Sequence, residues 1–237
     1  MKIEILYPEV CYLFGDLMNV EYLRRCIPEA EVIRTSLKTP PAFLYGDVDM
    51  VYLCSMTERA QELVINALRP YKAQIEALIE GGTVFLATGN ALEIFIKDIE
   101  NEDGSKIKAL GLFDMTAKRR MTDRYNSLWL GKFGGLDMVG LKSQFAHAYG
   151  GDGVAGLFET VRGAGRNPGV KPEGIRKNNF MATYVLGPLL IMNPLFTKYI
   201  MGLLGAGDRP LAYEEAAMDS YNLRLKEYSD PKRGFDY

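Results

Sequence analysis

The stretch Val84-Phe85-Leu86-Ala87-Thr88-Gly89-Asn90-Ala91-Leu92-Glu93-Ile94-Phe95-Ile96-Lys97 decides the fold. An apolar, partly β-branched run ends in Thr-Gly-Asn, and an apolar pattern with helical spacing follows. This predicts a buried strand, a sharp turn and then a helix. In α/β proteins such a turn lies at the carboxyl end of the sheet, where ligands bind. Thr88 is at the apex, which is the nucleophile's place in hydrolase elbows, so Thr88 is a candidate nucleophile.

The composition is typical of one globular domain in a reducing compartment. The 237 residues are 48% apolar, which is enough for a sizeable core, and we expect a single domain over residues 1–237. The net charge of -2 gives no indication of a nucleic-acid partner. Cys11, Cys26 and Cys54 are too far apart for a CxxC site and predict reduced, buried thiols in a cytoplasmic protein. The most apolar stretch, residues 186–204, contains prolines and a lysine and predicts no membrane span.

The chain contains a single histidine, His147. Zinc sites usually need several histidine or cysteine ligands, so we expect no metal site, and no motif predicts a cofactor. Nucleophilic catalysis by serine, threonine or cysteine needs a base beside the nucleophile. His147 is the one histidine that could supply it.

Helix and strand signals alternate along the first hundred residues. Strands are predicted over residues 3–7, 31–37, 49–54 and 84–87, and helices over residues 20–26, capped by Asn19, and about 57–79, capped by Ser55 or Thr57 and broken at Pro70. This order predicts a three-layer α/β fold with a largely parallel central sheet flanked by helices.

The pattern of predicted elements changes after a polar turn at residues 100–105. Shorter, partly antiparallel strands are predicted over residues 107–112, 125–130, 138–141 and 156–161, as extensions of the fold. Residues 162–177 are rich in glycine, proline and basic side chains and predict a surface loop. A strand over 179–186, a helix starting at Pro194 and a final helix over about 213–228 complete the chain.

Several short segments, in order along residues 3–205, carry a family resemblance. They are Leu6-Tyr7-Pro8-Glu9, Leu13-Phe14-Gly15-Asp16 with Asn19, Gly111-Leu112-Phe113-Asp114, Val139-Gly140-Leu141, Thr183-Tyr184-Val185, Gly187-Pro188-Leu189-Leu190 and Asn193-Pro194. Together they resemble the class I glutamine amidotransferase-like domain of the cobyric acid synthase type, with the closest likeness to the small glutaminase subunit of lipid II isoglutaminyl synthase. The resemblance implies a flavodoxin-like three-layer fold. Residues 206–237 would then form a C-terminal helix and tail.

The resemblance implies hydrolysis of glutamine to glutamate and ammonia, which passes to a partner synthetase. That chemistry needs a cysteine thiolate at the elbow, a histidine base and backbone N–H groups for the oxyanion. Here Thr88 aligns with the cysteine, Leu186 with the histidine, and Cys54-Ser55-Met56 with the glycine-rich oxyanion loop. A threonine hydroxyl is barely ionised at neutral pH, and nucleophile and base act as a unit. We therefore expect the glutaminase activity to be absent.

The same resemblance suggests ligand-binding residues. Those around the elbow and the oxyanion loop are Ser55, Met56, Gly89 and Asn90. Arg119, Arg120 and Arg124 lie near the position from which the resembled subunit contacts the glutamine carboxylate, and a bidentate arginine suits a carboxylate. We expect two of these three arginines to be solvated. Gln144 aligns with a family histidine, and an insertion of three residues would put His147 there instead.

Simpler interpretations remain open for the catalytic candidates. The Thr88 hydroxyl could bond the turn backbone or cap the helix. Cys54 closes a central strand, where it could be a low-pKa thiol or a buried structural cysteine.

Three functions follow from these residues. The first is a non-catalytic, glutaminase-like subunit that stabilises a Mur ligase-like, ATP-dependent synthetase acting on a cell-wall precursor, or gates its ammonia. The second is an active amidotransferase or hydrolase with a re-tooled cleft that uses Cys54, Thr88 or His147. The third is a binding module for glutamine or a related small amide.

Overall fold

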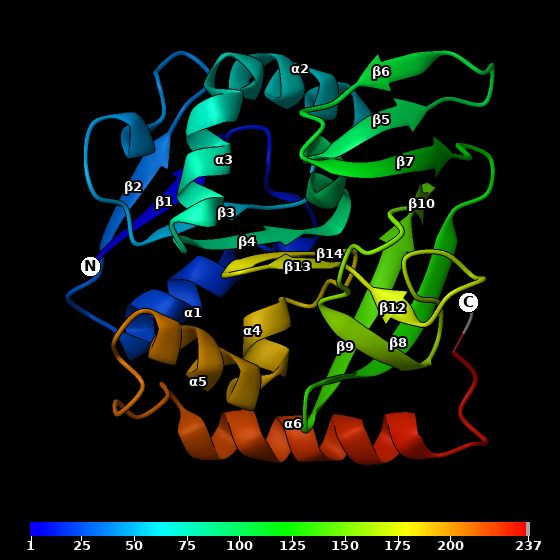
Figure 1. The fold of residues 1–237 in the computed structure, drawn as a ribbon. Helices are drawn as coiled ribbons and strands as arrows, with labels where there is room; N and C mark the ends of the chain where they lie inside the picture. Colours follow the sequence, from blue (N-terminus) through cyan, green and yellow to red (C-terminus); the bar gives the residue numbers. More distant parts are fainter. Residues whose placement is uncertain (236–237) are drawn as a thin grey trace.

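A six-stranded, mostly parallel sheet forms the centre of the computed structural model, which describes residues 1–235 (Figure 1). Its strand order is β13-β14-β4-β3-β1-β2, and all neighbouring pairs are parallel except β13 with β14. The strands are β1 (Lys2–Leu6), β2 (Glu31–Thr35), β3 (Met50–Leu53), β4 (Val84–Thr88), β13 (Ile175–Lys177) and β14 (Phe180–Thr183). The predicted α/β fold with a largely parallel central sheet is confirmed.

Helices cover both faces of this sheet. On one face lie α2 (Glu58–Leu68) and α3 (Lys72–Glu80), and on the other α1 (Met18–Cys26), α4 (Leu189–Met192) and α5 (Pro194–Leu203) (Figure 1). The expected break at Pro70 is confirmed, because a short 3-10 helix, Arg69–Tyr71, separates α2 from α3. Thr57 caps α2 by accepting a hydrogen bond from the Ala60 N–H at 3.2 Å.

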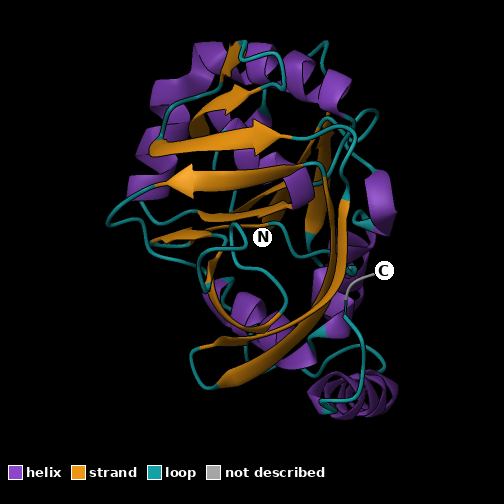
Figure 2. Ribbon diagram, turned by 90° about the vertical axis from the view of Figure 1, so that its right-hand side faces the viewer, coloured by secondary structure: helices purple, strands orange, loops and turns teal. Residues whose placement is uncertain are grey.

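Two smaller sheets extend the fold. One has the order β10-β7-β5-β6 and the other β12-β11-β8-β9. Their strands are β5 (Ile96–Glu100), β6 (Lys106–Lys108), β7 (Phe113–Arg119), β8 (Tyr125–Phe133), β9 (Leu136–Gln144), β10 (Ala146–Gly150), β11 (Phe158–Arg162) and β12 (Pro172–Glu173). The antiparallel extension is confirmed, although β8 and β9 pair over nine residues each and are longer than expected. The last helix, α6 (Glu214–Ser229), packs against β8 and β9 and appears end-on below the long curved strands in Figure 2.

Four local expectations are wrong. The strand expected over residues 107–112 falls mostly on the connection between β6, which ends at Lys108, and β7, which begins at Phe113. The helix expected after the elbow is a buried 3-10 helix, η4 (Gly89–Ile94), followed by strand β5. The run Leu92–Ile96 satisfies either period, and the β-branched Ile96 and Ile99 fit a strand. Asn19 does not cap α1, because the helix begins before it and its amide bonds Tyr52 instead. Residues 162–177 are not simply a surface loop, since they contain β12, β13 and three buried polar side chains, those of Arg166, Asn167 and Glu173.

No helix within residues 1–235 is long and apolar enough to cross a lipid bilayer. The interior contains one large apolar cluster that spans the sheet and its helices, and a small cluster under α6. The three cysteines are buried and free, as expected.

Candidate functional site

The elbow after β4 has its strained residue at Gly89. Thr88 has ordinary extended backbone angles, φ -116° and ψ 149°, whereas Gly89 has φ +63°. A Cβ atom on Gly89 would lie 2.7 Å from Ser55 Cβ and 3.1 Å from Leu186 Cδ2. Only glycine therefore fits this turn without displacing its neighbours. Since η4 is a short 3-10 helix, no long α-helix dipole points at Thr88.

The Thr88 side chain belongs to a closed buried network. Its hydroxyl donates to Asp16 Oδ2 at 2.7 Å and lies 3.1 Å from the Tyr52 hydroxyl oxygen. Tyr52 in turn donates to the Asp16 carbonyl at 2.8 Å and accepts a hydrogen bond from Asn19 Nδ2 at 2.9 Å. Thr88, Asp16 and Asn19 are fully buried, so this hydroxyl has no path to a substrate.

Burial raises the pKa of Asp16 to about 7, although hydrogen bonds from Thr88 and Ser55 oppose the rise. Its second oxygen, Oδ1, has no hydrogen-bond partner within residues 1–235. Ser55 Oγ donates to Asp16 Oδ2 at 3.2 Å and to the Leu13 carbonyl at 3.1 Å. Ser55 is thus the residue that joins this network to the cavity described next.

A partly open pocket of about 90 Å³ lies beside the elbow, with room for several water molecules. It is walled by the loop after β1, the loop after β3, the elbow, and the ends of β7 and β9. The lining residues are Leu13, Phe14, Ser55, Met56, Thr57, Glu58, Gly89, Asn90, Glu93, Arg119, Arg124, Ser143, Gln144, Phe145 and Ala146. Of the residues expected to bind ligand, Arg120, which is exposed and outside the lining, is the exception. The others come together here with Arg124; they are Ser55, Met56, Gly89, Asn90, Arg119 and Gln144.

Within residues 1–235, two buried polar atoms of this lining have no hydrogen-bond partner. Arg119 is 7% exposed; it donates from Nη1 to Asn101 Oδ1 at 3.1 Å and from Nη2 to Gln61 Oε1, while its Nε–H remains unpaired. Gln144 donates from Nε2 to the Ala146 carbonyl at 2.6 Å, and its Oε1 accepts nothing. Both atoms belong to side chains of the cavity wall but have almost no accessible surface, so a carboxamide or an amino-acid zwitterion would pair with them only after these side chains move.

Glu93 is the cavity residue that sequence reasoning missed. It is 2% exposed, and Gln61 Nε2 donates to its Oε2 at 2.9 Å. Burial raises the pKa of this carboxyl to about 7, while the Gln61 hydrogen bond and the Arg119 charge oppose the rise. A glutamate within the apolar run Leu92-Glu93-Ile94 was the available signal, because an isolated acid among apolar residues indicates a partnered buried group.

The remaining catalytic candidates do not line the cavity. Cys54 donates from Sγ to the Cys11 carbonyl at 2.7 Å, and burial raises the pKa of its thiol well above the usual range. Burial, and next the Lys142 charge, lower the pKa of His147 to about 4; its Nδ1 lies 3.2 Å from Gln144 Nε2, and its ring meets the Tyr125 ring edge-on. Leu186 pairs through its backbone with Leu141.

Of the three arginines, Arg120 and Arg124 are exposed and Arg119 is buried, so the expected two solvated arginines are confirmed. Arg124 stacks over the Phe145 ring, with its Cζ atom 4.3 Å from the ring centroid.

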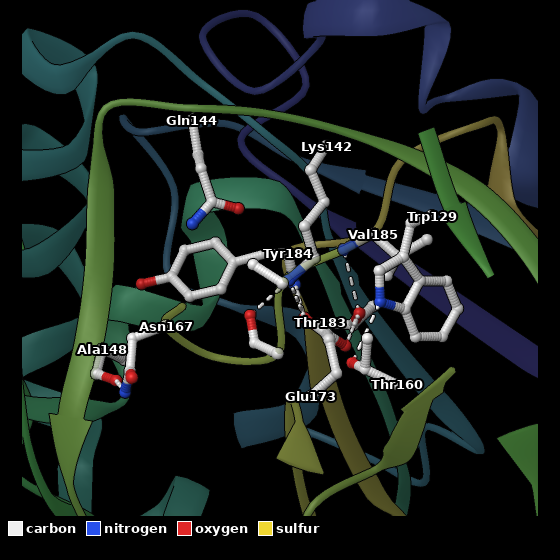
Figure 3. Close-up of polar contacts among 12 residues, drawn as sticks. Trp129, Lys142, Gln144, Ala148, Thr160, Asn167, Glu173, Thr183, Tyr184 and Val185 are labelled. Atoms are coloured by element: carbon white, nitrogen blue, oxygen red, sulfur yellow. Dashed lines mark hydrogen bonds and ion pairs between the residues drawn. The ribbon is translucent and has the colours of Figure 1, made fainter. Parts of the chain in front are cut away.

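Beyond Gln144, strand β9 leads to a buried ion pair (Figure 3). Lys142 Nζ lies 3.3 Å from Glu173 Oε1, and both side chains are fully buried. Glu173 also accepts hydrogen bonds from Thr183 Oγ1 at 2.5 Å and from the Tyr184 N–H at 2.9 Å. This cluster connects β9 and the β12–β13 segment to the end of β14. It therefore fixes the strands that carry Gln144 and lead to Leu186.

Solved structures of the same architecture come from glutamine amidotransferases. One crystal structure of a glutamine amidotransferase superposes with a TM-score of 0.57 at 16% identity, over 85% of this chain and 98% of the other. A glutamine amidotransferase from Thermotoga maritima superposes with a TM-score of 0.56 at 10% identity, over 94% of this chain and 92% of the other. PurLQS from the same organism superposes with a TM-score of 0.56 at 13% identity, over 94% of this chain and 98% of the other. At these identities the likeness establishes the fold alone: this chain has the fold of the class I glutamine amidotransferases.

No protein-family model matches the chain. Among curated proteins, it is 22% identical over 191 residues to the lipid II isoglutaminyl synthase (glutamine-hydrolyzing) subunit GatD of Staphylococcus aureus, covering 80% of this chain and 78% of GatD. The chain is thus distantly homologous to GatD, and the resemblance found in the sequence is confirmed.

Proposed function

We propose that this chain is a glutamine amidotransferase-like subunit that does not hydrolyse glutamine. The supporting observation is the elbow. In hydrolase elbows the nucleophile occupies the strained residue of the turn. Here that residue is Gly89, which has no side chain, and Ser55 Cβ and Leu186 Cδ2 fill the space above it. The neighbouring Thr88 has a relaxed backbone and directs its hydroxyl to Asp16.

The groups that could activate a nucleophile support the same proposal. Leu186 carries no proton, and His147, with its pKa lowered to about 4, contacts Gln144 rather than Thr88 or Cys54. The buried thiol of Cys54 stays protonated at neutral pH because its pKa is raised. Ser55 is the lining residue whose hydroxyl meets a carboxyl, at 3.2 Å from Asp16 Oδ2, and the same hydroxyl lies 3.1 Å from the Leu13 carbonyl oxygen. Ser55→Ala therefore belongs among the variants that test the proposal.

Glutamate release from L-glutamine tests this proposal. The wild-type chain should release no glutamate above the buffer blank, while an active glutaminase run in parallel does. Turnover that disappears in Thr88→Ala, Ser55→Ala or Cys54→Ala would overturn it. Mass spectrometry after treatment with 6-diazo-5-oxo-L-norleucine, an electrophilic glutamine analogue, gives an independent readout, because an adduct on any of these three residues would contradict the proposal.

We further propose that the chain acts beside an ATP-dependent, Mur ligase-like synthetase that amidates a cell-wall precursor. The support is the homology to GatD, which is itself one subunit of a lipid II isoglutaminyl synthase. Coexpression with a Mur ligase-like protein from the same genome, followed by size-exclusion chromatography, tests the pairing. A complex whose amidating activity runs on ammonium but not on glutamine is the expected outcome. Separate elution of the two chains would contradict it.

A second function, binding of a small amide without hydrolysis, is favoured by the unpaired Arg119 Nε and Gln144 Oε1. A ligand that pairs both atoms would raise the melting temperature according to RT ln(1 + [L]/Kd). Gln144→Ala and Arg119→Gln should abolish a shift caused by L-glutamine or L-asparagine. Arg120→Gln is the matched control, because Arg120 lies outside the cavity. No shift with any amide-bearing amino acid would count against this function.

A further inference from the structure

A second, larger pocket lies on the helical side of the molecule, between α1, α4 and the start of α6. Its volume is about 400 Å³, within the range of small-molecule sites. Its walls are mostly apolar, and none of its residues lines the elbow cavity. The lining residues are Met18, Tyr22, Arg25, Gly187, Pro188, Ile191, Met192, Tyr213, Ala216, Ala217, Ser220 and Arg224.

The charge in this pocket is entirely positive. Arg25 and Arg224 are its only ionisable side chains apart from two tyrosines, and no carboxylate belongs to the lining. Within residues 1–235 neither arginine forms an ion pair, whereas the nearby Arg24 pairs with Glu21 at 3.0 Å. Arg25 donates only to the Tyr213 hydroxyl, at 3.1 Å, and Arg224 only to Ser220. Because a guanidinium has five N–H donors, both retain free donors for an anion.

Tyr213 forms the edge of the pocket in an unusual conformation. Its backbone is left-handed, with φ 54° and ψ 40°, and its side chain is 69% exposed. The Arg25 Cζ atom lies 6.0 Å from its ring centroid. A bulky residue rarely adopts this backbone, and such strained residues cluster at ligand clamps. The tyrosine ring thus extends the apolar wall of the pocket while its hydroxyl orients one of the two arginines.

We propose that this pocket binds a small organic anion, a carboxylate attached to an apolar body of phenylalkanoate size. The apolar part would lie on Met18, Ile191 and Met192, and the carboxylate would accept hydrogen bonds from one of the two arginines, Arg25 or Arg224. Arginine suits this role, because its planar fork pairs with both oxygens of a carboxylate. An uncharged apolar ligand would lack the charge-assisted hydrogen bond to an arginine, so the pocket favours the acid.

The pocket shares its elements with the elbow region. Met18 precedes Asn19, whose side chain donates to the Tyr52 hydroxyl and accepts from the Leu190 N–H at 2.8 Å. Gly187 follows Leu186 directly. An occupant would therefore fix α1 against α4 at the point where both connect to the Thr88 network.

Isothermal titration calorimetry with a matched pair of probes tests the proposal. 4-Phenylbutyrate should bind saturably at one site, and its uncharged analogue 4-phenylbutanamide about tenfold more weakly or worse, since a hydrogen bond to a charged group is lost. The double variant Arg25→Gln/Arg224→Gln should weaken binding of the acid about tenfold as well. Lys226→Gln, an exposed change on α6 outside the pocket, should bind like the wild type.

Ala217→Trp should block the acid by filling the pocket, with the circular dichroism spectrum as a check of folding. If this variant fails to fold, the exposed and half-exposed arginine changes still decide the matter. Equal affinity for acid and amide, unchanged affinity in the double arginine variant, or no saturable heat at millimolar probe would each overturn the proposal.

Discussion

The Thr88 hydroxyl donates a hydrogen bond to Asp16 Oδ2 over 2.7 Å, inside the protein and away from the cavity. This contact gives the residue at the elbow a structural role, because it satisfies one oxygen of a buried carboxyl whose other oxygen has no partner. The consequence is a stability effect rather than a catalytic one.

Thr88→Val should therefore destabilise the fold without altering any activity. Valine matches threonine in shape but leaves Asp16 Oδ2 with only the longer bond from Ser55, and an unsatisfied buried acceptor costs about 1–3 kcal/mol. Urea unfolding measures the loss. Thr88→Ser, which retains the hydroxyl, is the control and should lose less. A valine variant as stable as the wild type would show that the hydrogen bond contributes nothing.

The raised carboxyl pKa values predict how stability depends on pH. Asp16 and Glu93 have folded-state pKa values of about 7, above the ordinary values of 3.8 and 4.5. Between these limits the folded state binds more protons than the unfolded state, so both groups make stability fall as pH rises. We expect Asp16→Asn to remove about 2 kcal/mol of the wild-type decline between about pH 5 and pH 8.

Unfolding free energies of the wild type and Asp16→Asn at the two pH values check this sign. Glu93→Gln should act in the same direction and independently. A wild-type curve that rises over this interval, with no difference in either variant, would place both pKa values near those of ordinary carboxyls.

Gly89 predicts a non-additive pair of substitutions. Gly89→Ala should cost about 1 kcal/mol for the left-handed backbone and about 1–3 kcal/mol more for overpacking against Ser55. Ser55→Gly removes the closest of those contacts, so the double variant should be more stable than the sum of the single changes predicts. A double-mutant cycle by urea unfolding measures the coupling. Strict additivity would mean that Ser55 gives way without cost.

The local signals in the sequence predicted the fold better than they predicted the site. The strand runs, the Pro70 break and the helix start at Pro194 depend on nearby residues, and the structure has them. The elbow differs because the apolar residues of the run 92–96 fit both the helical and the strand period. Pairing of β5 with β6 and β7 favours the strand. Thr88 was placed at the apex from the residue pattern, whereas the strained backbone angle belongs to Gly89, and no residue type reveals φ in advance.

The sequence also contains no signal that several charged side chains are buried. Lys142 and Glu173 lie thirty-one positions apart and meet only because β9, β12 and β14 converge. Arg166 and Glu173 lie in a glycine-rich basic segment whose composition indicates a surface loop, yet the fold turns both inward. The expected ligand-binding residues came from the family resemblance, and the structure brings all of them except Arg120 together; that they bind a ligand stays a prediction.

The Lys142–Glu173 pair predicts the largest loss of stability from a single change. Lys142→Met leaves the fully buried Glu173 carboxylate without its ion-pair partner, which costs about 3–5 kcal/mol. Lys142→Met/Glu173→Gln removes both charges, and the glutamine oxygen can still accept from Thr183 and from the Tyr184 N–H, so the double variant should recover most of the loss. Urea unfolding of the three proteins measures this. If the double variant is no more stable than Lys142→Met, the lysine acts through packing and its bond to the Gly165 carbonyl rather than through charge.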